Sequence, residues 1–83
     1  MKFKAEIDVM PLDALLDPQG KAVTSSMKNI GLDSIESVRI GRHVSLLLEA
    51  SNMEDANKII EEACQKLLAN QIMEKYSYQI EKA

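Results

Sequence analysis

The sequence predicts an α+β fold, a two-layer βαββαβ sandwich in which an antiparallel sheet carries two helices on one face. Three observations predict it. Several short segments alternate apolar and polar residues, which is the period of a strand with one buried face. Two longer segments repeat apolar residues at the period of a helix. The segments follow the order strand, helix, strand, strand, helix, strand, and one sheet with both helices on one face buries every apolar stripe.

Length, charge and cysteine content narrow the class of protein. The chain has 83 residues, which predicts a single domain over residues 1–83. Its formal net charge is −3 and its charges are interleaved, which argues against nucleic acid or an anionic membrane as a partner. The apolar runs are too short to span a bilayer, and no signal-peptide core follows Lys2. The single cysteine, Cys64, excludes an internal disulfide and a cysteine-based metal cluster, so we expect a cytoplasmic protein.

The first strand is predicted over residues 2–9. Proline cannot donate to a strand ladder, so Pro11 ends this strand. The apolar residues of the buried face are Phe3, Ala5, Ile7 and Val9, and they alternate with Lys2, Lys4, Glu6 and Asp8.

The stretch "LDPQGKAV", residues 16–23, is either a phosphate-binding loop or a helix start. A phosphate loop has several glycines before a Lys-Ser/Thr pair, whereas here Gly20 is alone and Lys21 precedes an alanine. Asp17 instead suits an N-cap, Pro18 suits the first helical position, and Gly31 is placed to end the helix. A glycine in the first turn weakens a helix, and close approach of another backbone would explain it. The apolar face of this helix is formed by Val23, Met27 and Ile30.

Residues 34–40 and 43–50 read as two strands around a tight turn at Gly41 and Arg42. The glycine is expected to supply the positive φ that short hairpins need. The second of the two strands places Val44, Leu46 and Leu48 on one face.

The second helix is predicted over residues 52–69. Ser51 and Glu54 fit a capping box, and Asn70 is expected to close the last turn in the left-handed conformation. Its apolar stripe comprises Ala56, Ile59, Ile60, Ala63, Cys64, Leu67 and Leu68. A final strand over residues 75–81 points Tyr76, Tyr78 and Ile80 to one face.

The sequence predicts no catalytic residue and no metal site. His43 has no acidic neighbour in the sequence to orient its ring, so we expect an exposed strand residue on the wet face of the sheet. Cys64 lies on an apolar stripe and is expected to be a small core residue.

The chain also carries more apolar surface than one small domain needs. Leu12, Leu15 and Leu16 crowd a loop, and Leu47 points away from its apolar strand neighbours. The loop leucines either fold over an open end of the core or belong to an oligomer interface. For Leu47 we expect an oligomer interface.

Three motifs in order carry a resemblance: "LDPQGKAV" (16–23), "VRIGR" (38–42) and "CQKLLANQIMEKYSYQIE" (64–81). Together they resemble the PurS family, the small subunit of bacterial and archaeal phosphoribosylformylglycinamidine synthase. The family commonly has Lys where Arg42 stands, and Pro-Val where Gln71 and Ile72 stand.

The resemblance implies a non-catalytic subunit that bridges an ATP-dependent synthetase subunit and a glutaminase subunit, so that ammonia passes between them in de novo purine synthesis. It implies a homodimer or a dimer of dimers. It also implies no cofactor on this chain, because ATP, Mg²⁺ and glutamine are used by the partners. The partner contacts that it implies are Asp17, Pro18, Gln19, Gly20, Arg39, Gly41 and Arg42.

Two other classes share the strand and helix order. An amino-acid-sensing regulatory domain of the ACT type is the alternative, and it would bind a small ligand at a dimer interface. An RNA-binding domain needs aromatic residues on an open sheet face, whereas Phe3, Tyr76 and Tyr78 lie on predicted buried faces.

Overall fold

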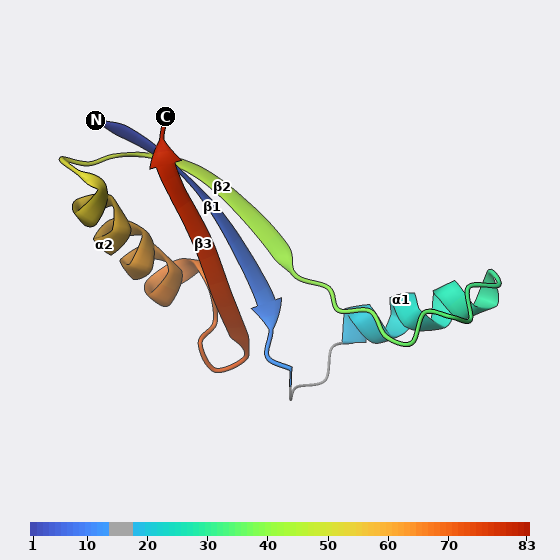
Figure 1. The fold of residues 1–83 in the computed structure, drawn as a ribbon. Helices are drawn as coiled ribbons and strands as arrows, with labels where there is room; N and C mark the ends of the chain where they lie inside the picture. The colour runs from blue at the N-terminus through green and yellow to red at the C-terminus, as the bar shows by residue number, and fades with distance from the viewer. Residues whose placement is uncertain (14–17) are drawn as a thin grey trace.

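The computed structural model describes residues 1–13 and 18–83, and its centre is a three-stranded antiparallel sheet with the order β2-β1-β3 (Figure 1). The α+β class and the antiparallel sheet are therefore confirmed. No helix within the described ranges is long and apolar enough to cross a membrane. In chain order the elements are β1 Lys2–Pro11, α1 Pro18–Asn29, β2 Arg42–Glu49, α2 Met53–Ala63, the π-helical turn η1 Cys64–Leu68, and β3 Glu74–Lys82.

The hydrophobic core lies between α2 and one face of the sheet. The central strand β1 supplies Ala5, which is opposite Leu46 of β2 and Ile80 of β3. Because directly opposite residues of antiparallel strands point to the same side, this register gathers the apolar residues of all three strands on one face. Among the described residues, the fully buried apolar side chains are Phe3, Ala5, Ile7 and Val9 of β1, Ala56 and Ile60 of α2, and Cys64. The alternation predicted for residues 2–9 and 75–81 is confirmed.

The second helix differs from its prediction at both ends. Asn52, one residue after the predicted Ser51, is the N-cap, and its side chain accepts a hydrogen bond of 2.8 Å from the Asp55 amide. The last turn widens into η1, where the Ala69 amide donates to the Cys64 carbonyl at 3.0 Å. The wider turn shifts the helical phase and leaves Leu67 81% exposed. The prediction that Asn70 adopts the left-handed conformation is wrong, because no described residue other than glycine has a positive φ.

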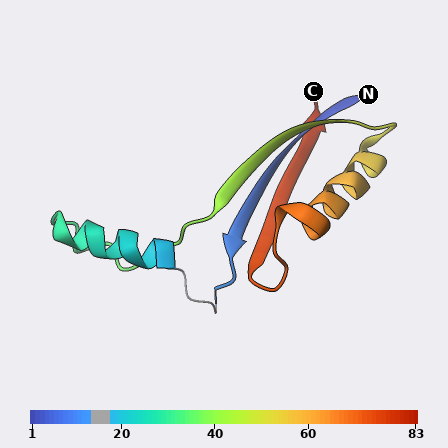
Figure 2. The ribbon, with the colours of Figure 1, turned by 180° about the vertical axis from the view of Figure 1, so that it is seen from behind.

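The first helix forms as predicted but does not lie on the sheet. It begins at Pro18, and Gly31 follows its end with a φ of 90°. Figures 1 and 2 show α1 and the chain after it extending together beyond the end of the sheet. Residues 18–41 thus form an arm, and the two-layer sandwich with both helices on one face is wrong in this respect. The predicted N-cap Asp17 lies outside the described residues.

The strand predicted over residues 34–40 is absent, and β2 begins only at Arg42. Among the described residues no strand lies beside this segment, which runs along α1 (Figure 1), and the Val38 amide donates to the Thr24 hydroxyl at 2.9 Å. The predicted hairpin turn is therefore wrong too, and Gly41 has no positive φ. A glycine is required at position 41 for another reason: a Cβ there would overlap the Val9 carbonyl oxygen and the Met10 sulfur of β1.

Candidate functional site

The structure brings the two predicted contact motifs together at the base of the arm. Pro18, Gln19 and Gly20 form the first turn of α1, and residues 39–42 return beside it (Figure 1). Thr24 joins the two stretches, because its hydroxyl donates to the Gly20 carbonyl at 2.7 Å and accepts from the returning chain. We call residues 18–20 and 39–42 the arm base.

Arg39 fixes the direction of the arm. Its guanidinium donates to the carbonyl oxygens of Pro11, Leu12 and Asp13, at 3.1, 2.7 and 3.2 Å. Pro11 is the last residue of β1, where it lies opposite Glu74 of β3, and Leu12 and Asp13 follow the end of the strand. The predicted contact of Arg39 with a carboxylate or phosphate of a partner stays a prediction, and within the chain this residue holds main-chain carbonyls.

Arg42 joins three elements at the arm base. It forms a bidentate pair with Glu74 of β3, at 2.6 and 3.0 Å, and donates to the Leu68 carbonyl of η1 at 2.5 Å. Glu74 also accepts from the Asn70 amide at 2.8 Å. The Arg42 guanidinium, and after it the Asn70 amide, hold the pKa of Glu74 below its ordinary value. The start of β2 is thereby tied to the turn that leads into β3.

The remaining predicted contact residues differ in exposure. Pro18 and Gln19 are exposed, whereas Gly20 is buried within its own chain. Leu12 is half-buried, and its amide donates to the Met73 carbonyl at 2.9 Å. Leu47 is 61% exposed on the polar face of the sheet, opposite Lys4. Asp17, Leu15 and Leu16 lie outside the described residues.

His43 has two acidic neighbours that sequence spacing did not reveal. Its Nδ1 lies 2.6 Å from Asp8 Oδ1, and its Nε2 lies 2.5 Å from Glu6 Oε2. The Ser45 hydroxyl donates to the same Glu6 carboxylate. An ionised carboxylate only accepts hydrogen bonds, so both ring nitrogens must donate, which requires the imidazolium form. Asp8, followed by Glu6, accordingly raises the pKa of His43.

This cluster lies on the polar face of the sheet, above a shallow hollow of about 310 Å³. Hydrogen bonds from Ser45 and His43 lower the pKa of Glu6 to about 2. The exposed strand position predicted for His43 is confirmed. The signal that could have found its neighbours is the pairing of β1 with β2, which sets Asp8 opposite His43 and Glu6 opposite Ser45.

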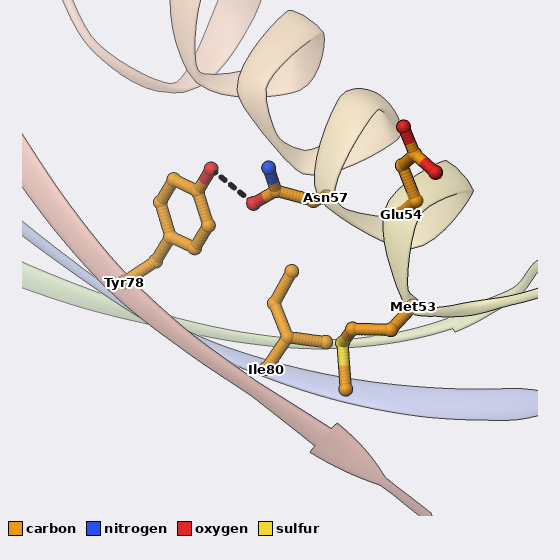
Figure 3. A pocket seen from close by; sticks show the side chains of 5 residues that line it. All are labelled: Met53, Glu54, Asn57, Tyr78 and Ile80. Atoms are coloured by element: carbon orange, nitrogen blue, oxygen red, sulfur yellow. Dashed lines mark hydrogen bonds between the residues drawn. The ribbon is translucent and has the colours of Figure 1, made fainter.

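A second hollow, of about 470 Å³, lies between α2 and β3 and is lined by Met53, Glu54, Asn57, Tyr78 and Ile80 (Figure 3). The Tyr78 hydroxyl lies 2.7 Å from Asn57 Oδ1 and 2.6 Å from Glu61 Oε2. Burial and the hydrogen bond to Glu61 raise the pKa of Tyr78 to about 12.

Tyr76 shares the same acceptor as Tyr78. Its hydroxyl donates to Glu61 Oε1 at 2.5 Å, and the two tyrosine rings stack with centroids 6.4 Å apart. The two hydrogen bonds from the tyrosines lower the pKa of Glu61. The polar ends of both rings are therefore paired with α2, and only their apolar rings remain for other contacts.

Cys64 is buried under the sheet, and this burial raises the pKa of its thiol. A raised pKa disfavours the thiolate that a nucleophile requires. Within residues 1–13 and 18–83, no group of three or more His, Cys, Asp or Glu side chains is arranged to hold a metal ion.

Comparisons with known proteins identify the family. The model of the PurS family, described as phosphoribosylformylglycinamidine (FGAM) synthase, matches residues 4–82. The PurS subunit of the Bacillus subtilis synthase is 35% identical over 79 residues, which cover 95% of this chain and 93% of that protein. The Synechocystis PurS subunit is 39% identical over 78 residues, covering 94% of this chain and 78% of that protein.

A solved structure agrees with the sequence comparisons. The structure of PurLQS from Thermotoga maritima contains a chain that is 30% identical to this one, with a TM-score of 0.88, and the match covers 98% of this chain and 99% of that chain. Sequence and fold thus agree over nearly the whole length, and the chain belongs to the PurS family of phosphoribosylformylglycinamidine synthase.

Proposed function

We propose that this chain is the PurS subunit of an FGAM synthase in purine biosynthesis and that it assembles with a synthetase subunit, PurL, and a glutaminase subunit, PurQ. The observation that carries the proposal is the family match over residues 4–82. The PurLQS structure of the Thermotoga maritima protein supports an assembly of the same kind here.

In this proposal the chain has a structural role and the chemistry belongs to its partners. The glutaminase releases ammonia, the synthetase uses ATP and Mg²⁺ to install it, and the small subunit bridges the two so that ammonia reaches its acceptor. Two features support this division. The His43 nitrogens are both engaged with carboxylates, and the Cys64 thiol is buried. Neither side chain offers a base or a nucleophile to a substrate.

We place the partner contacts on the arm base, with Leu12 and Leu47 in the oligomer interface. The arm base lies at the junction of arm and sheet, where Pro18 and Gln19 are exposed beside the returning chain. Arg42 is half exposed even though it is paired with Glu74, so one side of its guanidinium faces outward. A partner carboxylate could bind to this side of Arg42. Because Glu74 already holds the Arg42 side chain in place, binding would cost little side-chain entropy.

The decisive experiment is a pull-down of the tagged chain with separately purified synthetase and glutaminase subunits, with and without ADP and glutamine. We expect a ternary complex, glutamine-dependent synthesis only when all three proteins are present, and no hydrolysis of glutamine or ATP by this chain alone. Gln19→Glu at the arm base should weaken capture, and Gln65→Glu on the outer side of η1 is the matched control.

Absence of capture under every condition would refute the bridging role. The ACT-type alternative predicts a different result, namely calorimetric binding of a free amino acid to the isolated chain. Glutamine- or ATP-hydrolysing activity in a preparation shown to lack the other subunits would refute the non-catalytic role.

A further inference from the structure

The last turn of α2 is wider than an α-helical turn. In η1 the Ala69 amide donates to the Cys64 carbonyl at 3.0 Å, whereas in an α-helix it would donate to the Gln65 carbonyl. The Gln71 side chain donates to that Gln65 carbonyl instead, at 3.2 Å. Turns of this kind are rare, and η1 contains neither glycine nor proline that would require one. The cause of the π turn therefore lies in contacts made from outside the segment.

The π turn decides which of two leucines faces the sheet. Ile60 and Cys64 are fully buried, and an unbroken α-helix would continue their face at Leu67. The extra residue in the wider turn brings Leu68 to that place instead. Leu68 packs against the core, while Leu67 is 81% exposed. The same sequence thus allows two windings of the helix end, one with Leu68 inward and one with Leu67 inward.

Arg42 holds the winding that turns Leu68 inward. Its guanidinium donates to the Leu68 carbonyl at 2.5 Å and is itself fixed by the bidentate pair with Glu74. Glu74 also accepts from the Asn70 amide through its carboxylate, and its own amide donates to the Asn70 carbonyl at 2.6 Å. Rewinding the turn to an α-helix would rotate the Leu68 carbonyl around the helix axis and away from the guanidinium.

The main chain of Arg42 is fixed by the base of the arm. Arg42 is the first residue of β2, where it lies opposite Val9 of β1, and residues 18–41 leave the sheet just before it (Figures 1 and 2). The preceding Gly41 lies so close to Val9 and Met10 that a Cβ would overlap them. One side chain therefore connects the arm base to the end of α2.

From these contacts we propose that Arg42 couples the arm base to the winding of the helix end. When the guanidinium binds the Leu68 carbonyl, α2 ends in the π turn and Leu67 is exposed together with Ile72 and Met73. When this bond is broken, the turn rewinds to an α-helix and Leu67 replaces Leu68 against the core. The two windings are the two states of one element, and Arg42 shifts the population between them.

This coupling has a consequence for assembly, and that consequence rests on the proposed function. A partner carboxylate on the outer side of Arg42 would hold the guanidinium against Leu68 and would favour the π turn. Occupation of the arm base would then determine which apolar side chains the end of α2 offers to a second partner. By linkage, a partner that binds the exposed Leu67 would in turn strengthen binding at the arm base.

The test compares the exposure of the two leucines in the isolated full-length chain. NMR measures it as the relaxation that a soluble gadolinium chelate causes in methyl groups, with the exposed Leu47 and the half-buried Leu46 as references. In the wild type we expect strong relaxation at Leu67 and weak relaxation at Leu68. Arg42→Gln should reverse this order, with the relaxation of Leu67 falling severalfold to the level of Leu46.

Two further variants bracket the result of Arg42→Gln. Arg42→Lys keeps the charge without the two-pronged contact, so it should give a smaller shift in the same direction. Lys58→Gln, on the exposed side of α2, removes one positive charge away from η1 and should leave the order of the two leucines unchanged.

A second substitution separates rewinding from simple loosening of the helix end. Loosening would raise the relaxation of both leucines, whereas rewinding exchanges them. Leu67→Gln, added to Arg42→Gln, places a polar side chain that resists burial, so it should restore the protection of Leu68. The proposal is overturned by unchanged relaxation in Arg42→Gln, by a rise at both leucines, or by failure of Leu67→Gln to restore protection. None of these measurements uses PurL or PurQ, so such a failure leaves the proposed function standing.

Discussion

At the scale of single residues, His43 gives the molecule a pH-dependent contribution to stability. Its pKa is raised in the folded chain by Asp8 and Glu6, so its contribution is complete below the unfolded value of about 6.5 and is lost as the pH rises through the folded value. Glu6 acts in the opposite range. Its pKa is lowered to about 2, so its contribution is present above about 4.5 and is lost as the pH falls toward the folded value.

We therefore predict that His43→Gln lowers the melting temperature most between about pH 5 and 6 and least above about pH 8. The measurement is a series of melting curves across this range, with Lys58→Gln as a control that removes one positive charge away from the cluster. A difference from wild type that stays constant with pH would contradict the doubly bonded imidazolium.

Gly41 provides a second prediction at this scale. A methyl group there would overlap main-chain and side-chain atoms of Val9 and Met10 in the neighbouring strand. Gly41→Ala should therefore destabilise the fold by about 1–3 kcal/mol, as overpacking usually does. Urea unfolding measures the loss, and Ser37→Ala on the exposed part of the arm is the control. An unchanged unfolding midpoint would mean that β1 and the chain at residue 41 move apart without any loss of stability.

The environment of a side chain was predicted well where it depends on the residue's own segment, and poorly where it depends on the pairing of two strands. Phe3 and Cys64 were predicted inside because their own segments alternate or repeat, and both are buried. The carboxylates around His43 come from a strand more than thirty positions away and were missed. Only the register of two strands brings these side chains together, and one strand's sequence does not contain that register.

At the scale of elements, β1, α2 and β3 were predicted because each has an apolar stripe that the others cover. Val38 and Ile40 also alternate with polar residues, yet residues 34–40 form no strand, because strand formation requires a neighbouring ladder and α1 is their neighbour instead. The helical period of residues 18–29 predicted that α1 forms, but it did not predict where α1 lies relative to the sheet. That position depends on the contacts of Arg39 with the end of β1.

This difference between sheet and arm leads to a prediction about stability. Ile60 is fully buried between α2 and the sheet, so Ile60→Ala should cost about 2–5 kcal/mol. Val23 lies on the arm and is half-buried, so Val23→Ala should cost less than about 1 kcal/mol. Urea unfolding at low protein concentration compares the two. Equal losses would show that α1 belongs to the same core as α2.

At the scale of the whole molecule, the chain is extended. Its radius of gyration is 16.4 Å, whereas a compact chain of this length has a value of about 12 Å. The arm leaves apolar side chains uncovered, and Ile30 on it is 72% exposed. Surfaces of this kind are usually covered by another chain.

We therefore predict at least a dimer at micromolar concentration, and a melting temperature that rises with protein concentration. Light scattering measures the first and a dilution series of melting curves the second. A stable monomer whose melting temperature is independent of concentration would contradict this prediction.

The shared Glu61 acceptor also gives the molecule an optical signal of its own. The chain has two tyrosines and no tryptophan, and both tyrosine hydroxyls lie against this one carboxylate. A phenol that is hydrogen-bonded to a carboxylate loses its excited state rapidly, so the folded protein should fluoresce weakly in the ultraviolet. Detaching α2 from β3 separates the donors from the acceptor and should brighten the emission. Unlabelled protein, followed by its tyrosine fluorescence alone, would thus report when this helix leaves the sheet.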